Sequence, residues 1–277
     1  MREEMSRDNR VLVMGEDIGA RGGVFLATEG FVEEFGDERV IDTPLAESSI
    51  AGIALGAAIN GMRPIAEIQF ADFIWPTFTQ LVGEAARAHY GTNGTVTVPI
   101  VVRSPQGGGV RGGLYHSQSV EAFFAHTPGL IVIAPATPYD AKGLLIQAIR
   151  DDDPVMFLEH KVMYDTKGEV PDEPYAIPFG EANVTRSGDD VTVVAMGRMV
   201  LFANEVADKL AGEISVDVID PRTTSPLDIE LIIESVEHTG RLVVVDESYP
   251  MCNVASEIIS SVSCEALSSL RAAPKKI

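Results

Sequence analysis

The sequence predicts an α/β protein made of two doubly wound domains, each with a mainly parallel sheet. Strand-like and helix-like patterns alternate along almost the whole chain, which is typical of parallel strands joined by helices. The stretch 161–178 interrupts this alternation, because it carries three prolines and several charges and has no periodicity. We therefore predict a larger domain over residues 1–165, a linker over 166–183 and a smaller domain over 184–277.

The composition is that of a globular protein with an ample core, since 45% of its 277 residues are hydrophobic and only 22% are charged. A formal net charge of −20 argues against nucleic acid or an anionic membrane as a partner. No targeting peptide or membrane span is recognisable, so we expect a cytoplasmic protein. Cys252 and Cys264 are too far apart on one helix to bridge, and we expect them to be core thiols.

Each element follows from a local pattern of apolar residues. In the first domain, the strands are predicted over 11–14, 39–41, 65–70, 99–102, 131–134 and 155–158, and the helices over 50–60, 77–90, 120–126 and 141–150. In the second domain, the strands are predicted over 191–195, 216–219 and 242–245, and the helices over 201–210, 228–237 and 255–270.

The helix over 50–60 is apolar on nearly every face, so we expect it to be buried in a core. Ser48 or Ser49 can cap its start, because a hydroxyl oxygen accepts from the first backbone N–H groups. Three glycines leave one stripe of this region almost without side chains, which suits close approach by another helix or chain: Gly52, Gly56 and Gly61.

Glu47 stands at the start of this helix and is a candidate for proton transfer. Burial raises the pKa of a carboxyl group there, whereas the helix N-terminus lowers it. A carboxyl group under both influences can exchange protons near neutral pH. The alternative is a first-turn glutamate that only complements the helix dipole.

The stretch 107–112 contains the pattern G-x-G-x-x-G after a predicted strand. No helix opens at its last glycine, so the dinucleotide-binding interpretation fails. No pair of histidines has zinc-binding spacing and no nucleophile elbow occurs. His116 follows this loop and precedes a helix, a place that can face the ligand crevice of a parallel sheet. A structural histidine at a helix end is the alternative.

A series of short stretches then occurs in a fixed order: GEDIG at 15–19, DTPLAE at 42–47, AEIQFADF at 66–73, RSP at 103–105, LYHSQS at 114–119, AFFAHTPG at 122–129, AIRDDDP at 148–154 and DPRT at 220–223. Together they resemble the β subunit of the E1 component of 2-oxo acid dehydrogenase complexes. Residues 114–129 are more similar to the branched-chain enzymes than to the pyruvate enzymes. The resemblance implies a transketolase-like pyrimidine-binding domain and a transketolase C-terminal-like domain, the latter expected to be incomplete at its end.

The resemblance also implies thiamine diphosphate, shared with an α subunit. The family's diphosphate and magnesium motif does not occur in this sequence, so the α subunit would hold the diphosphate and Mg²⁺, and this chain the aminopyrimidine ring. The implied reaction is oxidative decarboxylation of branched-chain 2-oxo acids, with acyl transfer to the lipoyl domain of E2. The implied assembly is an α2β2 heterotetramer, so the partners are the α subunit, a second β subunit and the E2 dihydrolipoyl acyltransferase.

Individual residues carry over from the family's motifs. Glu47 would exchange a proton with the pyrimidine nitrogen, and Leu45, Gln69 and Phe73 would join it in binding the cofactor. His116 would be catalytic in acyl transfer. A monovalent cation such as K⁺ would be bound near Ile100, Ala148, Ile149, Asp151 and Asp153. For the acidic residues of that set, a solvated turn before Pro154 is the alternative.

Two other functions remain open at this point. One is the same chemistry on pyruvate, as in a pyruvate dehydrogenase E1 β subunit. The other is a non-catalytic α/β module that binds a nucleotide or an acyl group. A buried Glu47 helix favours the enzyme over the module.

Overall fold

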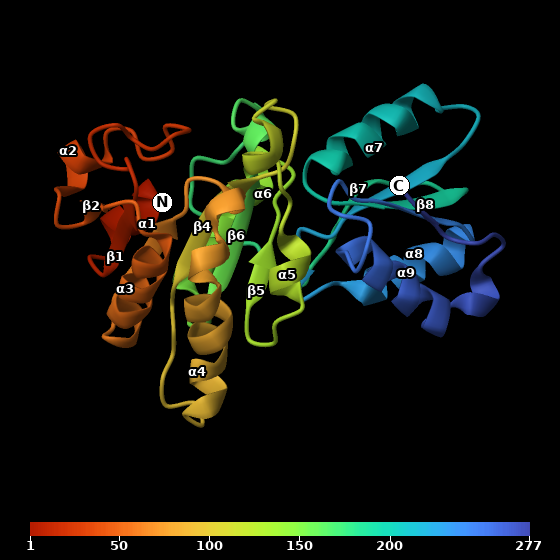
Figure 1. Cartoon of the computed structure of the whole chain (residues 1–277). Helices are drawn as coiled ribbons and strands as arrows, with labels where there is room; N and C mark the ends of the chain where they lie inside the picture. The colour runs from red at the N-terminus through yellow and green to blue at the C-terminus, as the bar shows by residue number, and fades with distance from the viewer.

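The computed structural model describes residues 1–277 and contains two α/β units, with the first to the left and centre of Figure 1 and the second to the right. The sheet of the first unit consists of β1 (Val11–Gly15), β2 (Val40–Asp42), β3 (Arg63–Glu67), β4 (Val101–Gln106), β5 (Ile131–Ile133), β6 (Val155–His160) and β10 (Thr223–Ser225). Their order across the sheet is β10-β5-β6-β4-β3-β1-β2. All neighbours are parallel except β10 and β5.

Both faces of this sheet are covered by helices: α1 (Arg2–Arg7), α2 (Phe31–Phe35), α3 (Glu47–Ile59), α4 (Ala86–Gly91), α5 (Glu121–Ala125) and α6 (Pro138–Arg150). Alternate residues of β1 point to opposite faces, because Leu12 belongs to the core that contains Ile50 of α3, and Val11 to the core that contains Leu144 of α6. This arrangement confirms the doubly wound fold class. The expected helix 77–90 is a π-helix over Thr79–Ala85 followed by α4.

The second unit has a five-stranded sheet built from β7 (Asn183–Arg186), β8 (Val191–Ala195), β9 (Val216–Asp220), β11 (Leu242–Val245) and β12 (Lys275–Lys276). The strand order is β12-β11-β8-β9-β7, and only β7 is antiparallel to its neighbour. Its helices are α7 (Arg198–Lys209), α8 (Ile229–Thr239) and α9 (Val254–Glu265). Helix α7 lies on one side of the sheet, and α8 and α9 lie on the other (Figure 1).

Two expectations about α3 were wrong. The helix begins at Glu47 and its N-cap is Ala46, which has no side-chain oxygen, so neither Ser48 nor Ser49 caps it. The helix is also not buried on every face, because Ile53 is 60% exposed. An apolar pattern in the sequence indicates only that the side chains are shielded from water. A helix face that binds another chain has the same pattern as a helix face in a core.

The cysteines were also misassigned. Cys252 and Cys264 are free and both are exposed rather than in the core. Cys252 lies outside α9 with a φ of 55°, in a bend that the helical pattern concealed. No helix in the structure is both long and apolar enough to cross a membrane.

The junction between the units holds a buried carboxyl group with a raised pKa, which makes the stability of the fold depend on pH. Glu121 at the start of α5 accepts a hydrogen bond from the Gln106 amide, and its other oxygen has no partner. Burial, and next the charge of Asp246, raise the pKa of Glu121 from 4.5 to about 7. The folded state therefore holds this proton more tightly than the unfolded state, so stability falls as the pH rises through that interval.

Glu121→Gln should accordingly stabilise the fold at pH 8 and have little effect at pH 4.5. The expected gain at pH 8 is at most about 3 kcal/mol, from the difference between 4.5 and about 7. Urea unfolding of both proteins at the two pH values measures it, with Glu265→Gln, an exposed site on α9, as the control. A gain of equal size at both pH values would contradict the pKa assignment.

Candidate active site

The residues predicted to bind the cofactor or to act in catalysis lie past the carboxyl ends of neighbouring strands, where parallel sheets commonly bind ligands. Glu16 follows β1 and Gln69 follows β3, and these strands pair in register. The Gln69 side-chain amide donates to the Glu16 backbone oxygen at 3.4 Å and to an Asp17 carboxylate oxygen at 3.2 Å. These contacts fix Gln69 against the loop after β1.

Glu47 is the first residue of α3 and is half-buried. Its charge acts on Glu16, which is 9% exposed and has one buried carboxylate oxygen without a hydrogen-bond partner. Burial, and next the charges of Glu47 and Asp17, raise the pKa of Glu16 above its ordinary value. The site therefore contains three carboxyl groups whose charges interact. Sequence reasoning assigned a role to Glu47 alone, although the motif after β1 contained Glu16.

An aromatic wall brings His116 and Phe73 together. The His116 ring meets Phe70 edge to face, with ring centroids 4.6 Å apart, and meets Phe73 in the same way at 5.4 Å. Phe25 packs against Phe70 from a third segment at 5.8 Å. Phe70 was not predicted as a site residue, although it stands in the same motif as Gln69 and Phe73.

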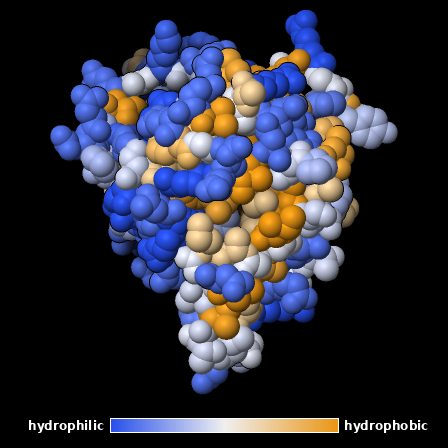
Figure 2. Space-filling view, turned by 90° about the vertical axis from the view of Figure 1, so that its left-hand side faces the viewer, coloured by the Kyte–Doolittle hydropathy of each residue, from blue (hydrophilic) through white to orange (hydrophobic).

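The surface beside Glu47 is apolar and open in the single chain. Leu45 is 78% exposed, and Ile53 and Ile59 on α3 are also exposed. Gly56, on the predicted glycine stripe, faces open space, because a Cβ atom added there would meet no other atom within 4 Å. Figure 2 views the side of the molecule on the left of Figure 1 and shows apolar residues gathered across its centre. Clustered exposed apolar side chains of this kind mark interaction surfaces.

Two of the residues expected to bind a monovalent cation, Ile149 and Asp151, have their backbone oxygens occupied by a guanidinium group instead. Arg63 donates to the backbone oxygens of Ile149 at 3.0 Å and Asp151 at 2.7 Å. Asp153 accepts from the His89 ring at 2.9 Å. The Ile100 oxygen accepts from a β6 backbone N–H group. This arrangement does not fit a cation at the Ile149 and Asp151 oxygens, because Arg63 already places its positive charge there.

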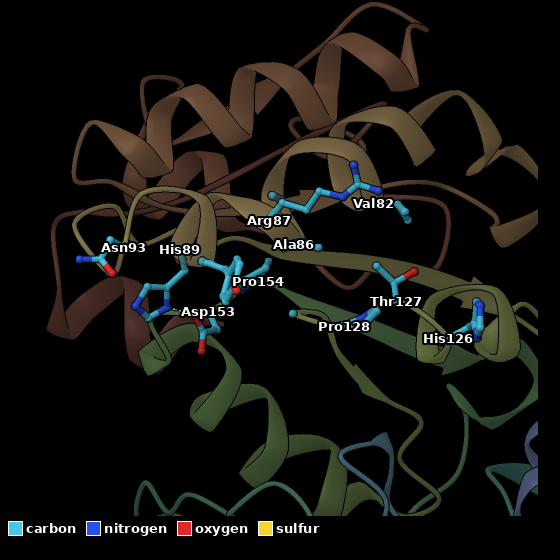
Figure 3. Close-up of a pocket in the computed structure, with 14 residues that line it drawn as sticks. Val82, Ala86, Arg87, His89, Asn93, His126, Thr127, Pro128, Asp153 and Pro154 are labelled. Carbon is cyan, nitrogen blue, oxygen red and sulfur yellow. Dashed lines mark hydrogen bonds and ion pairs between the residues drawn. The ribbon is translucent and has the colours of Figure 1, made fainter.

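A wide groove of about 1100 Å³ lies away from Glu47 and His116. Figure 3 shows its lining, with His89 and Asp153 facing each other at one end and His126 at the other. It opens between the region of α4 and the start of β6, so it is separate from the edge of the sheet that carries the predicted site.

Comparison with known proteins shows to which class of enzymes the fold belongs. Residues 1–167 match the family described as "Transketolase, pyrimidine binding domain", and residues 180–277 match "Transketolase, C-terminal domain". A solved structure described as "Split gene transketolase, inactive beta4 tetramer" superposes with a TM-score of 0.75 at 24% identity, covering 99% of this chain and 84% of that one. The fold is therefore that of transketolase-like enzymes, as the sequence implied.

Curated relatives identify the family more closely. The chain is 54% identical to "2-oxoisovalerate dehydrogenase subunit beta" of Bacillus subtilis, covering 100% of this chain and 85% of the relative. It is 48% identical to "Pyruvate dehydrogenase E1 component subunit beta" of the same organism (98% and 84%). It is 50% identical to "Acetoin:2,6-dichlorophenolindophenol oxidoreductase subunit beta" of Cupriavidus necator (98% and 83%). The chain belongs to the family of β subunits of 2-oxo acid dehydrogenase E1 components, and the family implies thiamine diphosphate as cofactor.

Proposed function

We propose that this chain supplies half of an active centre that decarboxylates branched-chain 2-oxo acids and passes the acyl group to the lipoyl domain of E2. One observation carries the proposal. Glu47 stands half-buried at the start of α3, between the buried acid Glu16 and an exposed apolar surface that includes Leu45 and Ile53. A proton-exchanging carboxyl group at the edge of an uncovered apolar surface suits a site that a second subunit completes.

Three side chains that we expect to bind the cofactor suit the aminopyrimidine half of thiamine diphosphate. Phe73 offers an aromatic ring and Leu45 an exposed apolar side chain, while Gln69 offers an amide held by the loop after β1. When bound, the cofactor supplies an electron sink for the loss of carbon dioxide. Glu47 would hold and release a proton at the pyrimidine nitrogen. In the proposed α2β2 assembly, the α subunit holds the diphosphate and its Mg²⁺.

The branched-chain preference rests on similarity to relatives, since the 2-oxoisovalerate enzyme is 54% identical and the pyruvate enzyme 48%. We expect the reconstituted αβ enzyme to favour 2-oxoisovalerate over pyruvate by at least about tenfold in kcat/KM, because methyl groups in a fitted pocket add binding energy. Steady-state assays with both acids and with acetoin measure this. Equal or better turnover of pyruvate would favour the pyruvate enzyme, and turnover of none would favour the non-catalytic module.

His116→Ala should damage acyl transfer to the lipoyl domain more than decarboxylation. We expect transfer to fall about 100-fold while decarboxylation, followed with an artificial electron acceptor, changes by less than about threefold. The reason is that His116 is proposed to face the channel through which the acyl group leaves. His238→Ala, at an exposed histidine on α8, is the control. Equal losses in the two assays would refute the role proposed for His116.

A further inference from the structure

We propose that His160 and Lys161, adjacent at the end of β6, hold the loop that carries His116, His160 at its base and Lys161 directly beside His116, and so act as positioning residues for acyl transfer. The loop is defined here as residues 107–119. This inference rests on the function proposed for His116. Both residues are buried, so they act through the loop and not by contact with a substrate at the surface.

His160 and Glu247 of the second unit meet the base of the loop, where its two ends come together. The His160 Nε2 atom lies 2.5 Å from a Glu247 carboxylate oxygen. That oxygen also accepts from the Ser119 hydroxyl at 3.5 Å. The base of the loop is closed by the Gly107 N–H group, which donates to the Gln118 oxygen at 2.8 Å.

Gly107 allows this contact because it has no side chain. Its φ is +86°, and a Cβ atom there would lie 2.1 Å from His160 Nε2 and 2.5 Å from a Glu247 oxygen. The neighbouring Gly108 has no atom within 4 Å of the same position. Only the first of the two glycines is therefore required by the contact between the loop, His160 and Glu247.

Glu247 remains a charged acceptor in this contact. Burial raises its pKa, but the hydrogen bond and charge of His160 outweigh that effect, so the pKa lies below its ordinary value. Because Glu247 follows β11, the contact ties the second unit to the loop of the first.

Lys161 holds the loop directly beside His116, through Asp72. One Asp72 oxygen accepts from the Ser117 N–H group at 3.2 Å, directly after His116. The other oxygen has no hydrogen-bond partner and lies 4.0 Å from Lys161 Nζ, which also has none. The two side chains are 0% and 1% exposed, for Lys161 and Asp72 respectively. Lys161 therefore places its ammonium group beside the buried carboxylate of Asp72, which accepts a hydrogen bond from the Ser117 N–H group next to His116.

The ammonium group of Lys161 also supports the aromatic wall. It lies 5.7 Å from the centroid of the Phe70 ring, and that ring contacts His116. Two neighbours of Lys161 therefore restrain His116. Asp72 holds the backbone that follows it, and Phe70 packs against its ring.

The test uses two variants in the reconstituted αβ enzyme, Lys161→Met and Gly107→Ala. Each should lower acyl transfer to the lipoyl domain about tenfold to a hundredfold while decarboxylation stays within about threefold, because a displaced His116 affects only the transfer step. Lys167→Met, an exposed lysine after β6, and Gly108→Ala are the matched controls and should change neither activity. Proportional losses in both activities, or unchanged transfer, would overturn the proposal.

Two further measurements separate positioning from general damage. The double variant Lys161→Met/Asp72→Asn should recover transfer, since an amide oxygen still accepts from Ser117 but leaves no buried charge. Hydrogen exchange of the Gly107 and Ser117 amides should be faster in the single variants and not in the controls. Unchanged exchange would refute the inference.

The outcomes also separate this inference from the role proposed for His116. If His116→Ala is selective for transfer while Lys161→Met and Gly107→Ala are not, the positioning role is wrong and the role of His116 stands. If His116→Ala is not selective, its role fails, and the exchange rates still decide whether these residues hold the loop.

Discussion

Glu47→Gln is expected to lower decarboxylation by the reconstituted αβ enzyme about 10³-fold. General acid–base groups contribute about 10² to 10⁴-fold, and glutamine keeps the size of the side chain without its exchangeable proton. Assembly should persist, because the Glu47 side chain is only half-buried and no side-chain hydrogen bond caps the start of α3. Carbon dioxide release and sedimentation of the heterotetramer measure the two outcomes separately.

A matched control for this variant is Glu205→Gln, an exposed glutamate on α7 in the second unit. It should leave both activity and assembly unchanged. Activity of Glu47→Gln within a few-fold of the wild type would rule out the proton-exchange role. Loss of the heterotetramer along with activity would show that Glu47 contributes to the interface rather than to proton exchange.

Arg103→Leu is expected to cost the fold about 3 to 5 kcal/mol, because it leaves the buried carboxylate of Glu67 without its charged partner and removes that of the partly buried Glu159. Arg103 is buried in β4, with nitrogens 2.8 Å from Glu67 and 2.7 Å from Glu159. Burial opposes its charge, but the two carboxylates outweigh burial and raise the pKa of Arg103 above its ordinary value. Urea unfolding of the chain at pH 7 measures the loss.

Arg186→Leu serves as the control for that measurement. Arg186 pairs with Asp208 at the surface, where the Asp208 side chain is 75% exposed. Exposed pairs contribute less than about 1 kcal/mol. If Arg103→Leu costs no more than Arg186→Leu, the buried carboxylates must be protonated or solvated in the folded chain, and the ion-pair account would be wrong.

Part of the candidate site could be predicted from the sequence, because family motifs are continuous stretches. Glu47, Gln69, Phe73 and His116 all stand in such stretches, and their roles remain predictions. Glu16 was not recognised, since its raised pKa depends on burial and on the charge of Glu47, which is distant in sequence. The potassium expectation likewise ignored Arg63, because nothing local to residues 148–153 indicates that a guanidinium group reaches them.

The sequence by itself determined the two doubly wound sheets and the family, because each strand or helix has an apolar period that its own residues set. Only the tertiary structure decided which neighbour covers each apolar face. It placed β10, from beyond the predicted linker, on the edge of the first sheet, left one face of α3 open, and brought Lys161 to Asp72. The apolar period of a segment shows which side chains are shielded from water. Which residues shield them depends on packing between segments that are distant in the sequence.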